Sequence, residues 1–113
     1  MEAISRLPFA ELERAIRLQI MNFVNFTGEI DVRELESRSW ASVTFSGARH
    51  RLKLTLSGPE APVVADSFLS NLSEAEFALR GHILADIALV SDRRPEGRDT
   101  VVLEIEALTV EDC

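Results

Sequence analysis

Apolar residues recur every three or four positions near the start of the chain. When the segment is wound as a helix, one face collects Phe9, Leu12, Ile16, Ile20 and Phe23, and charged residues take the opposite face. Pro8 suits the first turn, where a backbone N–H has no partner inside the helix. This spacing predicts a helix from Pro8 to Val24.

A second, shorter segment has the same spacing. Val64, Phe68 and Leu72 fall on one face between Glu60 and Leu72. Pro62 is compatible with a helix here because it lies in the first turn, where proline removes no helical hydrogen bond. The pattern therefore predicts a second helix, which follows a break at Ser57-Gly58-Pro59.

Alternation of apolar and polar residues predicts three strands in the middle of the chain, at 29–35, 40–45 and 49–56. Gly47-Ala48 fits a two-residue hairpin turn with glycine at its first central position. The register of that turn assigns one inner face to Ala41, Val43, Phe45, His50, Leu52 and Leu54. Two further strands are predicted at 77–90 and 100–110, joined by the polar loop Asp92–Arg98.

The predicted order of elements is therefore α-β-β-β-α-β-β. Antiparallel hairpins with segregated helices indicate an α+β fold of two layers, in which two helices cover one face of a five-stranded antiparallel sheet. The length of 113 residues favours a single domain spanning 1–113. The predicted core consists of Phe9, Leu12, Ile16, Ile20, Val43, Leu52, Leu54, Phe68, Ile83, Ile87, Leu103 and Ile105.

The outer face of the last two predicted strands mixes large aliphatic and acidic side chains. A half-apolar face with a charged rim is typical of protein–protein contacts, although single exposed aliphatic residues also occur on ordinary surfaces. We expect an interface that forms a homodimer, or that takes another protein partner. Its candidate residues are Trp40, Leu84, Ala88, Val102 and Leu108.

The chain has a net charge of −7, so it repels polyphosphate at long range and no nucleic-acid partner is expected. Between Ser37 and Pro59, however, the sequence has four basic residues and no acidic one. Arginine beside an aromatic residue is typical of anion sites, but these side chains can also pair with the chain's own acids. The alternative function is a small-ligand or anion-binding domain that uses Arg49, Arg51, Arg93, Arg94 and Arg98.

The spacing of Arg94 and Arg98 resembles the RxxxR motif of PilZ-type dinucleotide receptors, and Asp86–Leu89 resembles part of their second motif. The order of the two motifs is reversed in this chain, and the serine and glycine of the second motif are missing. The sequence is therefore not assigned to that family.

No arrangement of residues in the sequence indicates catalysis or metal binding. His82 and Asp86 lie about 13 Å apart along a predicted strand, and His50 is interpreted as a buried or rim histidine. Two isolated histidines lack the spacing of a metal site, and the single cysteine, Cys113, excludes both an internal disulfide and a CxxC site. We therefore expect no catalytic residue, no metal and no cofactor.

Targeting signals are also missing from the sequence. No apolar run approaches the roughly 20 residues that a membrane span needs, and no apolar region follows the N-terminus as in a signal peptide. The sequence thus favours a cytoplasmic, non-catalytic interaction or regulatory module with no membrane partner.

Overall fold

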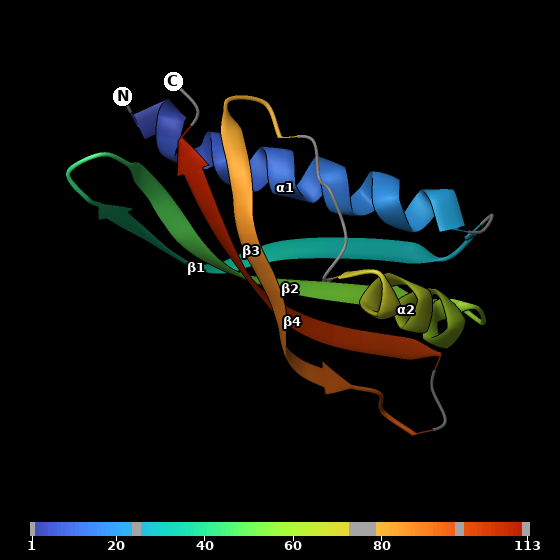
Figure 1. The fold of residues 1–113 in the computed structure, drawn as a ribbon. Helices are drawn as coiled ribbons and strands as arrows, with labels where there is room; N and C mark the ends of the chain where they lie inside the picture. Colours follow the sequence, from blue (N-terminus) through green and yellow to red (C-terminus); the bar gives the residue numbers. More distant parts are fainter. Residues whose placement is uncertain (1, 24–25, 73–78, 97–98, 112–113) are drawn as a thin grey trace.

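The computed structural model describes residues 2–23, 26–72, 79–96 and 99–111. The chain is α+β with an antiparallel sheet (Figure 1). Its elements in order are α1 (Glu2–Phe23), β1 (Glu29–Ala41), β2 (Ser46–Ser57), α2 (Ala61–Ser70), β3 (His82–Arg93) and β4 (Thr100–Glu111). Among the residues described, no helix is long and apolar enough to cross a membrane.

The sheet has four strands, so the prediction of a five-stranded sheet in the order α-β-β-β-α-β-β is wrong. The observed order is α-β-β-α-β-β, because β1 is one strand of 13 residues that includes the predicted strand 29–35 and only the first two residues, Trp40 and Ala41, of the predicted strand 40–45. Ser37, Arg38 and Ser39 interrupt the apolar alternation between those two segments. They lie on an edge strand and are exposed, so the sheet imposes no alternation on them.

The first hairpin turns at Ser42–Phe45 and not at Gly47-Ala48. The backbone N–H of Ser42 donates to the carbonyl of Phe45 at 2.7 Å, and the Ser42 hydroxyl accepts a hydrogen bond from the Phe45 N–H at 3.0 Å. A serine hydroxyl that bonds nearby backbone groups in this way stabilises a tight turn without glycine. Both predicted turn residues are instead part of β2, where Gly47 pairs with Trp40.

Gly47 is required for packing inside the sheet. A Cβ atom at this position would collide with the carbonyl oxygen of Thr109 on β4, and it would lie 3.0 Å from the ring of Trp40. The glycine therefore lets β4 approach closely and lets the indole of Trp40 lie over the β2 backbone. Glycine within a strand commonly marks such a close approach.

The topology consists of two successive α-β-β units. The strand order β1-β2-β4-β3 places the second strand of each unit in the centre of the sheet and the first strand of each unit at an edge. Figure 1 shows this arrangement, with the β1–β2 hairpin projecting at the end of the sheet away from α2. Both edges of the sheet, β1 and β3, are thus formed by topologically equivalent strands.

Both helices pack on one face of the sheet. The core brings together Leu12, Ile16, Ile20, Val64, Phe68, Leu52, Leu54, Leu103 and Ile105, which are all buried, and Phe9 and Ile87 pack against it partly buried. The predicted core contained each of these positions except Val64, which the sequence assigned only to the apolar face of the second helix. It was wrong for Val43 and Ile83: both side chains are exposed, because Val43 lies in the hairpin turn and Ile83 on the face away from the helices.

Candidate functional site

Among the residues that the structure describes, no helix or strand covers the face of the sheet opposite the helices, and this face divides into a charged middle and an apolar end. Strand pairing aligns Trp40, Gly47, Val110 and Ile83 in one row across all four strands at the apolar end. The next row contains Arg38, Arg49, Leu108 and Asp86. These two rows join the polar and apolar parts of the outer face.

A surface groove of about 440 Å³ lies where the two parts meet, and it is lined by Arg38, Ser39, Trp40, Arg49 and Leu108. Trp40 is half-buried, and its indole N–H is buried without an acceptor among the residues that the structure describes. A buried donor without a partner costs on the order of 1–3 kcal/mol. Trp40 and Leu108, both candidate interface residues from the sequence, are brought together here.

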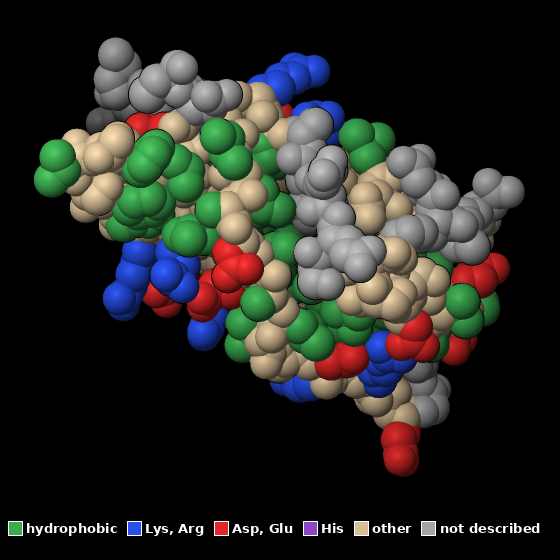
Figure 2. All heavy atoms as spheres, in the orientation of Figure 1, with side chains coloured by type: hydrophobic (Ala, Val, Ile, Leu, Met, Phe, Trp, Pro, Cys, Tyr) green, Lys and Arg blue, Asp and Glu red, His purple; other side chains and the backbone are tan. Residues whose placement is uncertain are grey.

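The apolar part continues over the hairpin turn. Val43 and Phe45 in the turn and Ile83 on β3 are exposed, and together with Val110 they line a second hollow of about 450 Å³. Figure 2 shows hydrophobic side chains gathered at this end of the sheet, with basic and acidic side chains directly beside them. We call this region the hairpin-end surface; it consists of Trp40, Val43, Phe45, Ile83, Leu108 and Val110.

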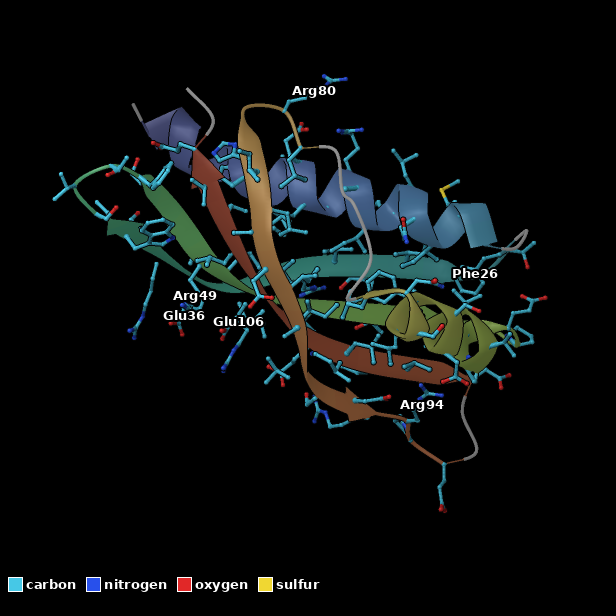
Figure 3. All side chains as sticks on the ribbon, viewed as in Figure 1. Phe26, Glu36, Arg49, Arg80, Arg94 and Glu106 are labelled. Carbon is cyan, nitrogen blue, oxygen red and sulfur yellow. The ribbon has the colours of Figure 1, made fainter. Side chains whose placement is uncertain are left out.

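The charged middle of the face is organised around Glu106 on β4. Its carboxylate accepts a hydrogen bond from Arg49 at 2.8 Å and lies 3.8 Å from the guanidinium of Arg51. Arg38 forms a similar exposed pair with Glu36 at 2.9 Å. Figure 3 shows Glu36, Arg49 and Glu106 on the same side of the hairpin. Arg49 and Arg51 are thus paired with Glu106 of β4, and Arg38 with Glu36 of its own strand.

The structure does not assemble the five arginines of the alternative site. Arg94 lies at the opposite end of the sheet from Arg49 (Figure 3), where it donates to Asp66 of α2 at 2.7 Å and to Asp92 at 3.0 Å. These two carboxylates raise the pKa of Arg94 above its ordinary value, so the guanidinium stays charged and paired. Arg93 ends β3 opposite Val102, and Arg98 lies outside the described residues.

The remaining predicted interface residues lie on different faces. Val102, Ala88 and Leu108 are on the outer face, but Leu84 packs against the core. A bulge between Leu84 and Asp86 adds one residue to β3. Because of the extra residue, Leu84 and Asp86 lie on opposite faces of the sheet, whereas strict alternation would place them on the same face. The expectation that Leu84 shares the outer face is therefore wrong.

His50 is the centre of a polar cluster on the helix-covered face, in which His50 and Thr109 are buried and Glu34 and Ser37 are exposed. Its Nδ1 atom lies 2.9 Å from a carboxylate oxygen of Glu34 and 3.4 Å from the Ser37 hydroxyl, and its Nε2 atom lies 3.2 Å from Thr109 Oγ1. Hydroxyl, imidazole and carboxylate in this order resemble a nucleophile, base and orienting group. His50 and Thr109 are both fully buried, so no substrate reaches them, and the cluster joins β1, β2 and β4.

The sequence pointed to His50 as a buried or rim histidine, and the structure confirms that it is buried. The sequence alone does not indicate the partners Glu34 and Thr109, because their positions depend on the pairing of three strands. His82 contacts the carbonyl of Arg80 at 3.3 Å and pairs with Glu111 across the strands. Within the described part of the chain, no group of three or more His, Cys, Asp or Glu side chains is placed to hold a metal ion.

Comparison with known proteins adds no assignment to this geometry. No protein-family model matches the chain, and no curated protein is similar enough to count as a relative.

Proposed function

We propose that the chain is a non-catalytic interaction module that acts as a homodimer, with the Trp40 part of the hairpin-end surface in contact between the two copies. The observation that carries this proposal is the apolar end of the outer face around Trp40. A contiguous exposed apolar region with a polar border is typical of a protein contact, and tryptophan is among the residues that contribute most to such contacts.

The charges of the outer face favour a second copy as the partner. The described strands direct equal numbers of basic and acidic side chains to this face, although the chain as a whole has a net charge of −7. The basic residues are Arg33, Arg38, Arg49, Arg51, Lys53 and Arg93, and the acidic residues are Glu29, Asp31, Glu36, Asp86, Glu104 and Glu106. A face with balanced charges approaches its own copy without the repulsion that a strongly acidic face would cause.

The burial of the His50 cluster supports a non-catalytic role. Thr109 Oγ1 would be the nucleophile of such a cluster, but it is fully buried and lies within 3.3 Å of the Ala48 carbonyl, to which it donates a hydrogen bond. A hydroxyl that is held in this way stabilises the pairing of β4 with β2. The groove beside Trp40 contains no histidine or carboxylate in its lining.

Sedimentation equilibrium of the wild-type protein tests the proposal directly, and we expect the mass of two chains at tens of micromolar. The change Trp40→Glu places a charge in the centre of the hairpin-end surface and should yield a monomer with unchanged far-ultraviolet circular dichroism. Val63→Glu is the matched control, because Val63 is an exposed aliphatic residue on α2, away from this surface. This control variant should remain dimeric.

A wild-type mass of one chain under these conditions would remove the proposal. A dimer that persists in the folded Trp40→Glu variant would show that the copies meet elsewhere. Loss of the dimer in both variants would indicate a general response to added charge and would also contradict the assigned surface.

A further inference from the structure

The free edge of β1 has a defined orientation of its backbone groups. In an antiparallel pair, successive residues direct their N–H and C=O groups alternately toward and away from the neighbouring strand. The bond from Ser42 N–H to the Phe45 carbonyl closes the turn. Bonded and non-bonded pairs alternate along β1 and β2 from this turn. The pair of Ala41 with Ser46 is therefore not hydrogen-bonded, and the pair of Trp40 with Gly47 is. Ala41, Ser39 and Ser37 therefore direct their backbone groups outward.

One outward carbonyl in the first half of this edge already has a partner. The guanidinium of Arg17 on α1 donates to the carbonyl of Ile30 at 3.0 Å. The register of β1 then shifts between Glu34 and Glu36, so the regular row of outward groups restarts only beyond this bulge. The open part of the edge is the segment Ser37–Ala41, which is free of bulges and ends at the hairpin turn.

Small side chains accompany the open backbone groups. Ser37, Ser39 and Ala41 lie on the helix side of β1 and are exposed, so another strand can approach without a steric obstacle. Proteins commonly protect an edge with proline, charged side chains or a bulge; this segment has no proline and no bulge, and its single charged side chain, Arg38, lies on the outer face. The side chains on its outer face are Arg38 and Trp40, both of which line the groove described above.

We infer that two copies of the chain pair through their β1 edges, antiparallel and centred on Ser39, so that two four-stranded sheets become one continuous sheet. This inference rests on the proposed function and narrows the contact to the part of the hairpin-end surface that lies on β1, which is Trp40; Leu108 on β4 lies outside it. Ser39 then lies opposite the partner's Ser39, and Ser37 lies opposite the partner's Ala41. On the outer face, Arg38 lies opposite the partner's Trp40, where a guanidinium can stack on an indole.

The sequence of the segment selects this register. Centring on Ser39 places small residues opposite small residues at every outward position, and it repeats the pairing of Arg38 with Trp40 on both sides of the two-fold axis. Centring on Ser37 would instead place Ser39 opposite the partner's Leu35, which lies at the bulge where regular pairing ends. A second copy supplies the required extended strand and needs no conformational change to do so.

Cysteine cross-linking tests the register at single-residue resolution. Opposed residues of a hydrogen-bonded antiparallel pair have Cα atoms about 5.5 Å apart, which is within the range that a disulfide spans. In a Cys113→Ser background, Ser39→Cys should form covalent dimers under mild oxidation. Ser37→Cys and Ala41→Cys should not do so alone, but the mixture of these two variants should form a covalent heterodimer.

A further variant separates edge pairing from stacking of the two outer faces. Leu108 lies on β4, which is separated from the β1 edge by β2. With edge pairing, Leu108→Arg should leave the sedimentation mass at two chains, whereas stacked outer faces would bury this position and the variant would become monomeric. Efficient self-cross-linking of Ser37→Cys, or a monomeric Leu108→Arg, would overturn the inference. In either case a dimeric wild type would still support the proposed homodimer. A monomeric wild type would contradict both the homodimer and the edge pairing.

Discussion

Replacing Phe68 by alanine measures how much of the stability depends on the contact between α2 and the sheet. Phe68 is 1% exposed and is the largest of the fully buried side chains. Removing an aromatic ring from such a position costs about 3–5 kcal/mol, because the apolar contacts are lost and the surroundings do not close the cavity. With a urea dependence near 2 kcal/mol per molar, the unfolding midpoint should fall by about 2 M.

Val43→Ala is the matched comparison, since the sequence places both residues in the core and the structure places only Phe68 there. Val43 is fully exposed, so its truncation should change the free energy of unfolding by less than about 0.5 kcal/mol. Urea unfolding followed by the fluorescence of the single tryptophan measures both variants. Each titration is run at several protein concentrations, because a dimer gains stability with concentration. Equal losses in the two variants would refute the assigned core.

Two further outcomes follow from the charges. Glu11 accepts hydrogen bonds from the Arg80 backbone N–H and from Arg14, and these bonds lower the pKa of Glu11 below its ordinary 4.5. The contribution of Glu11 to stability is therefore present above pH 4.5 and is lost as the pH falls through the lower pKa of the folded state. Glu11→Gln should therefore reduce the acid-induced fall of the urea midpoint, and an unchanged fall would contradict this contribution. Single-stranded DNA should not bind in a fluorescence-anisotropy titration at roughly 0.15 M salt, because Arg49 and Arg51 already pair with Glu106. Micromolar binding that weakens steeply with salt would contradict this prediction.

The sequence predicted the parts of the fold that local periodicity determines. The apolar spacing of α1 and the alternation of Leu52 with Leu54 and of Leu103 with Ile105 correctly identified the buried faces. These elements contact the core along their whole pattern, so each apolar position reports burial directly. The two-helix, antiparallel α+β class follows from the same signals.

The errors fall where backbone pairing, and not side-chain burial, determines the structure. Gly47-Ala48 is a good turn sequence, but β4 needs Gly47 for its close approach, and the turn forms at Ser42–Phe45. The bulge after Leu84 cannot be read from alternation, because one extra residue exchanges the two faces of the strand. The candidate site was predicted in part: Trp40 and Leu108 were both named, but their shared groove depends on the pairing of β1, β2 and β4.

The two edges of the sheet also explain why assembly should stop at two copies. β1 and β3 occupy equivalent positions in the two α-β-β units, and a chain with two open edges would pair repeatedly into a filament. The register of β3 shifts both between Leu84 and Asp86 and between Leu89 and Ser91, which leaves no regular run as long as Ser37–Ala41. Bulges twist an edge away from a partner, so among the described strands β3 is less open to pairing than the Ser37–Ala41 segment of β1. In the inferred arrangement the β1 contact is two-fold symmetric, so each copy would use its open edge once and the assembly would close as a dimer.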